Sequence, residues 1–190
     1  WHRIRAIVRK DVRAITASTM VLLPMIIVPL LLCIIVPTAL TVFALAFREQ
    51  AARELAQIAG IMEFYPIPDA LAEPTHRFLY VFLNYSFIPL FMLVPVMVAS
   101  VVAANSVVGE KERHTLETVL YTPITNREFL VGKLLSAFIP AVLIGIATFV
   151  AFFAVTNLVS YFMGGFVIVR ALIWIPSLLL LMPSVSLLGL

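Results

Sequence analysis

The polar stretch GEKERHTLETVLYTPITNREFLVGK, residues 109–133, separates two long apolar runs and decides how the chain folds. An interval this polar belongs in water, while its apolar flanks are long enough to lie in lipid. Within the stretch, apolar side chains recur at helical spacing on one face: Leu116, Val119 and Leu120. Charged side chains line the opposite face, so the sequence predicts a short amphipathic helix at the end of a membrane bundle.

The ends of this helix are also marked in the sequence. We expect Gly109 to break the preceding helix, and Pro123 to end the short one because proline lacks a backbone N–H. Thr125 followed by Glu128 matches a capping box, which predicts that a new helix starts there and continues into the next apolar run.

The composition indicates a membrane protein. Hydrophobic residues make up 63% of the chain, charged residues 12%, and the mean hydropathy is +1.10. The one cysteine, Cys33, lies in an apolar run, which excludes a disulfide or a cysteine zinc site within this chain. The net charge of +3 comes from basic residues beside apolar runs, a pattern of membrane topology, so no nucleic-acid partner is expected.

Four apolar runs are long enough to cross a bilayer: residues 20–47, 78–108, 134–157 and 171–190. The prediction is an all-α integral membrane domain over residues 1–190, with an interfacial helix, an outer loop and a cytoplasmic loop at residues 1–16, 48–77 and 109–133. The outer loop is too charged to span and is expected to hold one short helix over residues 50–61. Residues 158–169 form either a short outer connection or a segment that re-enters the membrane.

The first residues are expected to form a helix along the membrane surface. Apolar and basic side chains fall on opposite faces of residues 1–16 in a helical projection. Asp11 is the exception, because it falls toward the apolar face, where it can pair with a neighbouring basic residue. Pro24, Pro29 and Pro37 in the first span are expected to produce kinks.

The distribution of Lys and Arg predicts the orientation. Nine of the 13 lie in residues 1–16 and 109–133, against four in the two connections on the other side. Because Lys and Arg collect on the cytoplasmic side, the amino end and the central loop are predicted to be cytoplasmic, in a multi-pass protein of the cell membrane.

Catalytic motifs are missing from the sequence. It holds no H-E-x-x-H, G-x-S-x-G or Walker motif, so the chain is not expected to be an enzyme, and another chain would supply any energy from ATP. The second span carries polar side chains that either pack against other helices or line a pathway: Asn84, Ser86, Ser100 and Asn105. Apolar walls with scattered Asn and Ser favour an amphipathic or hydrophobic substrate.

The central loop resembles a known signature. The residues GEKERHTLE from Gly109, then Leu120, Thr122, Pro123 and Ile124, and finally Gly132 and Lys133, are similar to the G-E-K-E-R-x-T-L-E…L-x-T-P-I…G-K motif of export-type (type 2) ABC transporter permeases. His114 stands where many relatives have Gly. The order of interfacial helix, spans and loop also resembles that family over the whole chain.

The resemblance implies a permease with six spans, of which this chain would hold four, paired as a homo- or heterodimer. It also implies that a cytoplasmic ABC ATPase subunit binds the ATP and Mg²⁺, with no cofactor in this chain. The amphipathic helix would then be the coupling helix that docks on the ATPase, through Glu110, Lys111, Glu112, Arg113, Thr115, Leu116, Glu117, Leu120, Pro123 and Ile124.

Two other functions compete with this one. A membrane scaffold or assembly factor would use the amphipathic loop to recruit a soluble partner. A membrane-embedded transferase would use acids of the outer loop, such as Glu63 and Asp69, but these stand among prolines without a partner motif.

Overall fold

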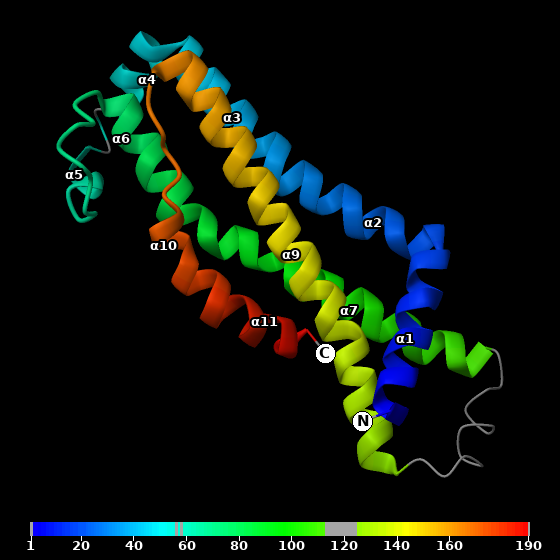
Figure 1. The fold of residues 1–190 in the computed structure, drawn as a ribbon. Helices are drawn as coiled ribbons and strands as arrows, with labels where there is room; N and C mark the ends of the chain where they lie inside the picture. The colour runs from blue at the N-terminus through cyan, green and yellow to red at the C-terminus, as the bar shows by residue number, and fades with distance from the viewer. Residues whose placement is uncertain (1, 56, 58, 113–124, 190) are drawn as a thin grey trace. The chain divides into compact units, whose positions relative to one another are not determined.

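The computed structural model describes residues 2–55, 57, 59–112 and 125–189, and the side chains of all of these except residues 59, 106–112 and 126. Within these ranges the chain forms helices and no strand (Figure 1). Four helical segments are long and apolar enough to cross a membrane: Thr19–Ala46, Pro74–Asn105, Arg127–Gly164 and Ala171–Leu188. The predicted class, an all-α membrane protein, is confirmed.

The helices follow one another in a simple order. The helix α1 (His2–Ala17) precedes the first span, which consists of α2 (Thr19–Pro29), the π-helix η1 (Leu30–Ile35) and α3 (Val36–Ala46). The second span consists of α6 (Pro74–Val81), the π-helix η3 (Phe82–Ser86) and α7 (Phe87–Glu112). The third is α9 (Asn126–Gly164), and the fourth consists of α10 (Ala171–Pro176), the π-helix η4 (Ser177–Leu181) and α11 (Met182–Leu188).

Three predictions about the segments that connect the spans are wrong. The helix α7 continues through Gly109 to Glu112, because one glycine costs a helix only about 1 kcal/mol relative to alanine. The third span continues to Gly164, so the connection to the fourth span is limited to residues 165–170, which are not helical. The outer loop holds two helices instead of one, α4 (Arg48–Leu55) and α5 (Ala59–Met62).

The π-helical segments coincide with prolines. Each contains the residue four positions before a proline: Cys33 before Pro37, Tyr85 before Pro89, and Leu179 before Pro183. A proline cannot donate to that residue's carbonyl, and its ring clashes with it, so the helix widens there to a longer hydrogen-bonded turn. In the first span, Pro37 therefore coincides with a local change of helix type, and the kinks expected at Pro24, Pro29 and Pro37 stay a prediction.

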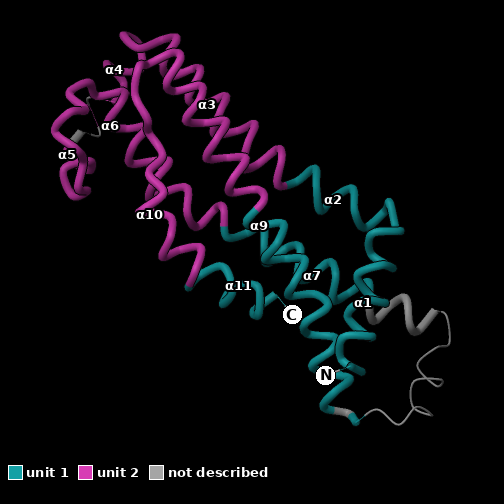
Figure 2. Tube along the Cα trace, in the orientation of Figure 1, with its two compact units in different colours: residues 1–28, 92–146, 180–190 teal, residues 29–91, 147–179 magenta. Residues whose placement is uncertain are grey.

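The described residues divide into two compact units (Figure 2). One unit contains residues 1–28, 92–146 and 180–190, and the other contains residues 29–91 and 147–179. The core of the second unit is a cluster of aromatic rings from α7, α9 and α10: Phe87, Phe91, Phe149, Phe152 and Trp174. The Phe152 and Trp174 rings lie 5.3 Å apart and both residues are 0% exposed, so close packing of the rings stabilises this unit.

Close approaches involving glycine occur in the first unit. A Cβ atom added at Gly145 would lie 3.0 Å from Met182 Cε, and one at Gly189 would lie 2.7 Å from the carbonyl oxygen of Val96. Ser100 donates a hydrogen bond of 2.8 Å to the carbonyl oxygen of Gly189. Small residues of this kind let helix backbones approach closely, which is how membrane helices gain packing contacts.

Candidate functional site

The predicted coupling segment lies mainly outside the described residues. Arg113, Thr115, Leu116, Glu117, Leu120, Pro123 and Ile124 all fall within residues 113–124, which the structure does not describe. The backbone of residues 110–112 forms the last turn of α7, so Glu110, Lys111 and Glu112 continue that helix beyond the candidate span, which ends at Asn105. Of this region, the structure describes the start of α9 and its contacts with α1.

The start of α9 is held by the predicted capping box. The backbone N–H of Thr125 donates to Glu128 Oε2 at 3.0 Å, and the backbone N–H of Glu128 donates to Thr125 Oγ1 at 3.3 Å. Thr125 Oγ1 also donates to Glu128 Oε2 at 3.0 Å. The two residues therefore satisfy backbone donors that the first turn of a helix leaves without partners, and the prediction is confirmed.

Asp11 connects α1 to α9. Its side chain is buried, at 5% exposure, although α1 is otherwise rich in charge. Lys133 Nζ lies 3.0 Å from Asp11 Oδ2, and Ser136 Oγ donates a hydrogen bond of 3.1 Å to the same oxygen. The predicted basic partner of Asp11 is thus Lys133, and Ser136, three residues farther along α9, completes the cluster.

Gly132 allows the two helices to approach. A Cβ atom at this position would lie 3.0 Å from Ile7 Cγ2, which is closer than nearly all real contacts of this kind. Ile7 precedes Asp11 by four residues and so lies on the same face of α1. The Gly132-Lys133 pair of the sequence motif therefore makes both the steric and the ionic contact with α1.

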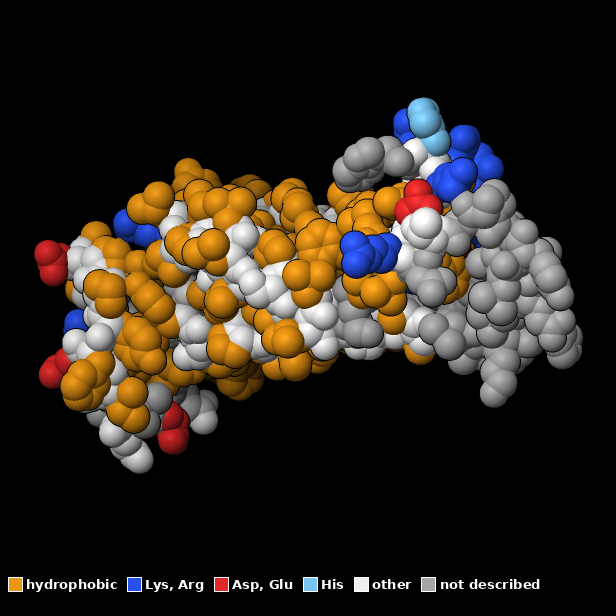
Figure 3. Space-filling model, turned by 90° about the horizontal axis from the view of Figure 1, so that it is seen from below, with side chains coloured by type: hydrophobic (Ala, Val, Ile, Leu, Met, Phe, Trp, Pro, Cys, Tyr) orange, Lys and Arg blue, Asp and Glu red, His pale blue; other side chains and the backbone are white. Residues whose placement is uncertain are grey.

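The opposite side of α1 is basic and exposed. Its side chains include His2, Arg5, Arg9 and Arg13, while the exposed Arg3 and Lys10 lie at the edge between the two sides. A second, weaker contact with α9 joins Arg3 and Glu128 at 3.8 Å, with side chains 54% and 29% exposed. Figure 3 shows a group of Lys and Arg side chains beside a His side chain, further Lys and Arg side chains at separate places, and many hydrophobic side chains on the visible face. The helix is amphipathic, as predicted, and its apolar side contacts the protein through Ile7.

Asn84 connects the second span to the chain between α9 and α10. Asn84 Nδ2 donates to the carbonyl oxygens of Tyr80 and Ile168, at 2.9 Å each, and Asn84 Oδ1 accepts from the backbone N–H of Arg170 at 2.9 Å. The side chain is 0% exposed. These bonds favour the packing role over the pathway role for this residue.

The other candidate pathway residues have different surroundings. Ser86 is exposed, Asn105 is half-buried, and Ser100 is exposed while it donates to the carbonyl oxygen of Gly189. Asn84 and Ser86 belong to one compact unit, and Ser100 and Asn105 to the other. Their role as a pathway stays a prediction.

Sequence reasoning missed two residues that act together with Asn84. Asn157 Nδ2 donates to the carbonyl oxygen of Val169 at 3.0 Å, and Asn157 Oδ1 accepts from the N–H of Val169 at 2.8 Å. Ser160 Oγ donates to the carbonyl oxygen of Phe166 at 2.7 Å. These side chains pair with backbone groups of the non-helical segment 165–170, in which Ile168 and Val169 are buried. Their spacing of three residues on one helix face was the signal in the sequence.

The comparison with known families agrees with this arrangement. A family model described as "ABC-2 family transporter protein" matches residues 5–188. The chain belongs to the ABC-2 transporter family. The match covers α1, the four spans and both sides of the central segment, so the ABC-2 chain is the membrane subunit of an ABC transporter. No curated protein and no solved structure matched the chain.

The alternative catalytic residues gain no support in the ABC-2 chain. Glu63 and Asp69 are both exposed in the loop that follows α5. Among the described residues there is no group of three or more His, Cys, Asp and Glu side chains able to hold a metal ion. Family membership implies association with an ABC ATPase and with the membrane.

Proposed function

We propose that this chain is the permease subunit of an ATP-binding cassette exporter in the plasma membrane. It would move its substrate outward with energy from ATP hydrolysed on a separate subunit, where ATP and Mg²⁺ bind. Membership of the ABC-2 family supports the transport role. The observation that supports coupling is the Asp11–Lys133–Ser136 cluster, because it joins α9 to α1 near the start of α9, which follows the predicted coupling segment of residues 110–124.

The coupling path begins at residues 110–124. The ATPase would bind the charged and apolar side chains of this segment, with Leu116 and Leu120 inserted in a groove of the partner. Movement of the segment would be transmitted to α9 because the capping box holds the first turn together. The pair of Asp11 and Lys133 would make α1 follow the same movement.

The orientation and the assembly are part of the same proposal. Nine of the 13 Lys and Arg residues lie in residues 1–16 and 109–133, which supports a cytoplasmic location for the amino end and the motif segment. Two permease chains, identical or different, would pair so that each engages one ATPase. Ser86, which is exposed, and Asn105, which is half-buried, remain candidate pathway residues.

The test is ATP hydrolysis by the partner ATPase, purified together with the complete permease in nanodiscs. In the double variant Leu116→Asp/Leu120→Asp, we expect loss of ATPase binding and of stimulated hydrolysis. The matched control is Ile61→Asp/Phe64→Asp, which introduces the same charges at exposed apolar residues of the other loop, 62% and 88% exposed.

The outcomes separate the competing functions. If both double variants bind and stimulate the ATPase as the wild type does, the coupling segment has been assigned wrongly. If the wild type binds the ATPase but substrate transport into sealed vesicles never depends on ATP, a scaffold function replaces the exporter.

A further inference from the structure

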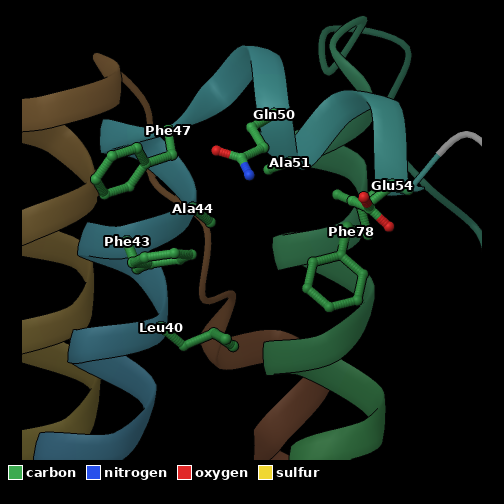
Figure 4. Close-up of a pocket in the computed structure, with 9 residues that line it drawn as sticks. Leu40, Phe43, Ala44, Phe47, Gln50, Ala51, Glu54 and Phe78 are labelled. Atoms are coloured by element: carbon green, nitrogen blue, oxygen red, sulfur yellow. The ribbon is translucent and has the colours of Figure 1, made fainter.

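A hollow of about 260 Å³ lies between α3, α4 and α6, within one compact unit (Figure 4). Its apolar side is formed by Leu40 and Phe43 of α3, by Phe47 directly after α3, and by Phe78 of α6. Leu40, Phe43 and Phe47 follow one another at helical spacing, so one face of α3 lines the hollow. Both helices belong to candidate spans, which makes this side suited to hydrocarbon.

The other side of the hollow is polar. Gln50 and Glu54 lie four residues apart on α4, which follows the first span and is not part of it. Figure 4 shows both side chains on the α4 side of the hollow, with Leu40 on the opposite side and the rings of Phe43 and Phe78 between them. Among the described residues that line the hollow, Glu54 is the charged one.

Apolar area remains available for a ligand to cover. The Phe43 and Phe47 rings lie 4.8 Å apart, and these residues are 62% and 51% exposed. The hollow is slightly smaller than typical ligand pockets of roughly 300–1,000 Å³, so it suits one hydrocarbon chain or one ring system. A ligand lying against these rings would gain packing contacts with them.

The polar side determines the headgroup. The Glu54 carboxylate repels a phosphate or sulfate and attracts an ammonium group, and the Gln50 side-chain oxygen accepts a further N–H bond. A phospholipid that carries an ammonium group also brings its phosphate near this carboxylate, whereas a simple ammonium amphiphile brings the positive charge alone. We propose that the hollow between α3, α4 and α6 binds a single-tailed amphiphile with an ammonium headgroup, its tail against Leu40, Phe43 and Phe78 and its headgroup at Gln50 and Glu54.

The site binds this ligand class whether or not the ligand is the transported substrate. Its test therefore measures binding in the absence of ATP and does not depend on the proposed exporter function. The probe is dodecylammonium with a photoreactive diazirine in its chain, added to the complete protein in nanodiscs of phosphatidylcholine. Two matched probes carry the same chain with a sulfate or a hydroxyl headgroup.

We expect the ammonium probe to label the peptide that contains residues 40–55 more strongly than the hydroxyl and sulfate probes. The Glu54→Gln variant should reduce its labelling about fivefold, which is the ratio that an ion pair of about 1 kcal/mol produces. Glu49→Gln changes another exposed acid of α4 that does not line the hollow, and should leave labelling unchanged. Leu40→Trp should block labelling by all three probes.

Equal labelling by the three headgroups would overturn the proposal and indicate that bilayer acyl chains fill the hollow. Labelling that Glu54→Gln does not reduce, or that Leu40→Trp does not block, would overturn it as well. Because Glu54 is exposed, its substitution is not expected to unfold the protein, and the thermal transition of each variant checks this.

Discussion

Lys133 Nζ lies 3.0 Å from Asp11 Oδ2, and this buried ion pair joins two helices at residues 122 positions apart in the chain. The pair lies next to Gly132, where a Cβ atom on α9 would lie 3.0 Å from Ile7 Cγ2 of α1. The helices α1 and α9 are therefore connected by a close packing contact and by an ion pair.

Removal of one partner of this pair should destabilise the protein strongly. Asp11→Ala leaves the Lys133 side chain, which is 15% exposed, without this carboxylate, and loss of one partner from a pair this little exposed typically costs about 3 kcal/mol of unfolding free energy. Unfolding in mixed detergent micelles measures this cost. The double variant Asp11→Leu/Lys133→Leu should recover most of the lost unfolding free energy. The control is Arg5→Ala, at an exposed position of α1, which should cost less than about 0.5 kcal/mol. Equal effects of Asp11→Ala and Arg5→Ala would contradict the structural role.

Asn84→Ala should release the segment between α9 and α10. The substitution leaves the carbonyl of Ile168 and the N–H of Arg170 without these hydrogen bonds, which together cost about 3 kcal/mol in a buried site. Hydrogen exchange of the Arg170 amide should become faster. The control is Ser184→Ala, an exposed hydroxyl that bonds within its own helix, and should leave this exchange unchanged. Unchanged exchange in Asn84→Ala would show that other contacts hold the segment.

Gly189→Ala should destabilise the contact between the end of α11 and α7. The added Cβ would lie 2.7 Å from a backbone oxygen of Val96, which cannot move away as a flexible side chain can. We expect a loss of about 2 kcal/mol in unfolding free energy. Gly60→Ala is the matched substitution, since a Cβ there meets no atom within 4 Å, and it should be neutral or slightly stabilising. Similar stabilities for the two variants would argue against a close approach at Gly189.

Loss of the capping box should weaken coupling more than folding. Thr125→Ala/Glu128→Ala removes the reciprocal bonds at the start of α9, which are worth about 1 kcal/mol. A free energy of about 1 kcal/mol corresponds to about a fivefold change in the ratio of molecules with and without an intact first turn of α9. Stimulated ATP hydrolysis should therefore fall about fivefold while the ATPase still binds. Thr16→Ala, which loses only bonds to carbonyls of its own helix, serves as control. Full stimulation in the double variant would mean that the first turn of α9 does not transmit movement.

The sequence was sufficient to predict those structural features that depend on one short stretch of residues. Apolar length identified the four spans, since unpaired backbone groups in lipid leave helices as the stable form. The box formed by Thr125 and Glu128 was readable because its partners are three residues apart. The same local reasoning failed at Gly109, where the cost of a single glycine is too small to end a helix that continues to Glu112.

Other features depend on residues brought together from distant parts of the chain. The position of Asp11 on an apolar face required a partner, but only the packing of α1 on α9 identified Lys133 and Ser136. Likewise, the polar character of Asn84 fitted either a pathway or a packing role, until the carbonyl of Ile168 was found beside it.

The sequence by itself determined the membrane class, the four spans and the family signature, because hydropathy and local hydrogen bonding depend on neighbouring residues. Only the tertiary structure decided which polar side chains satisfy one another and where Glu54 meets an apolar hollow. These contacts depend on the distance between helices, and no periodicity in the chain encodes that distance.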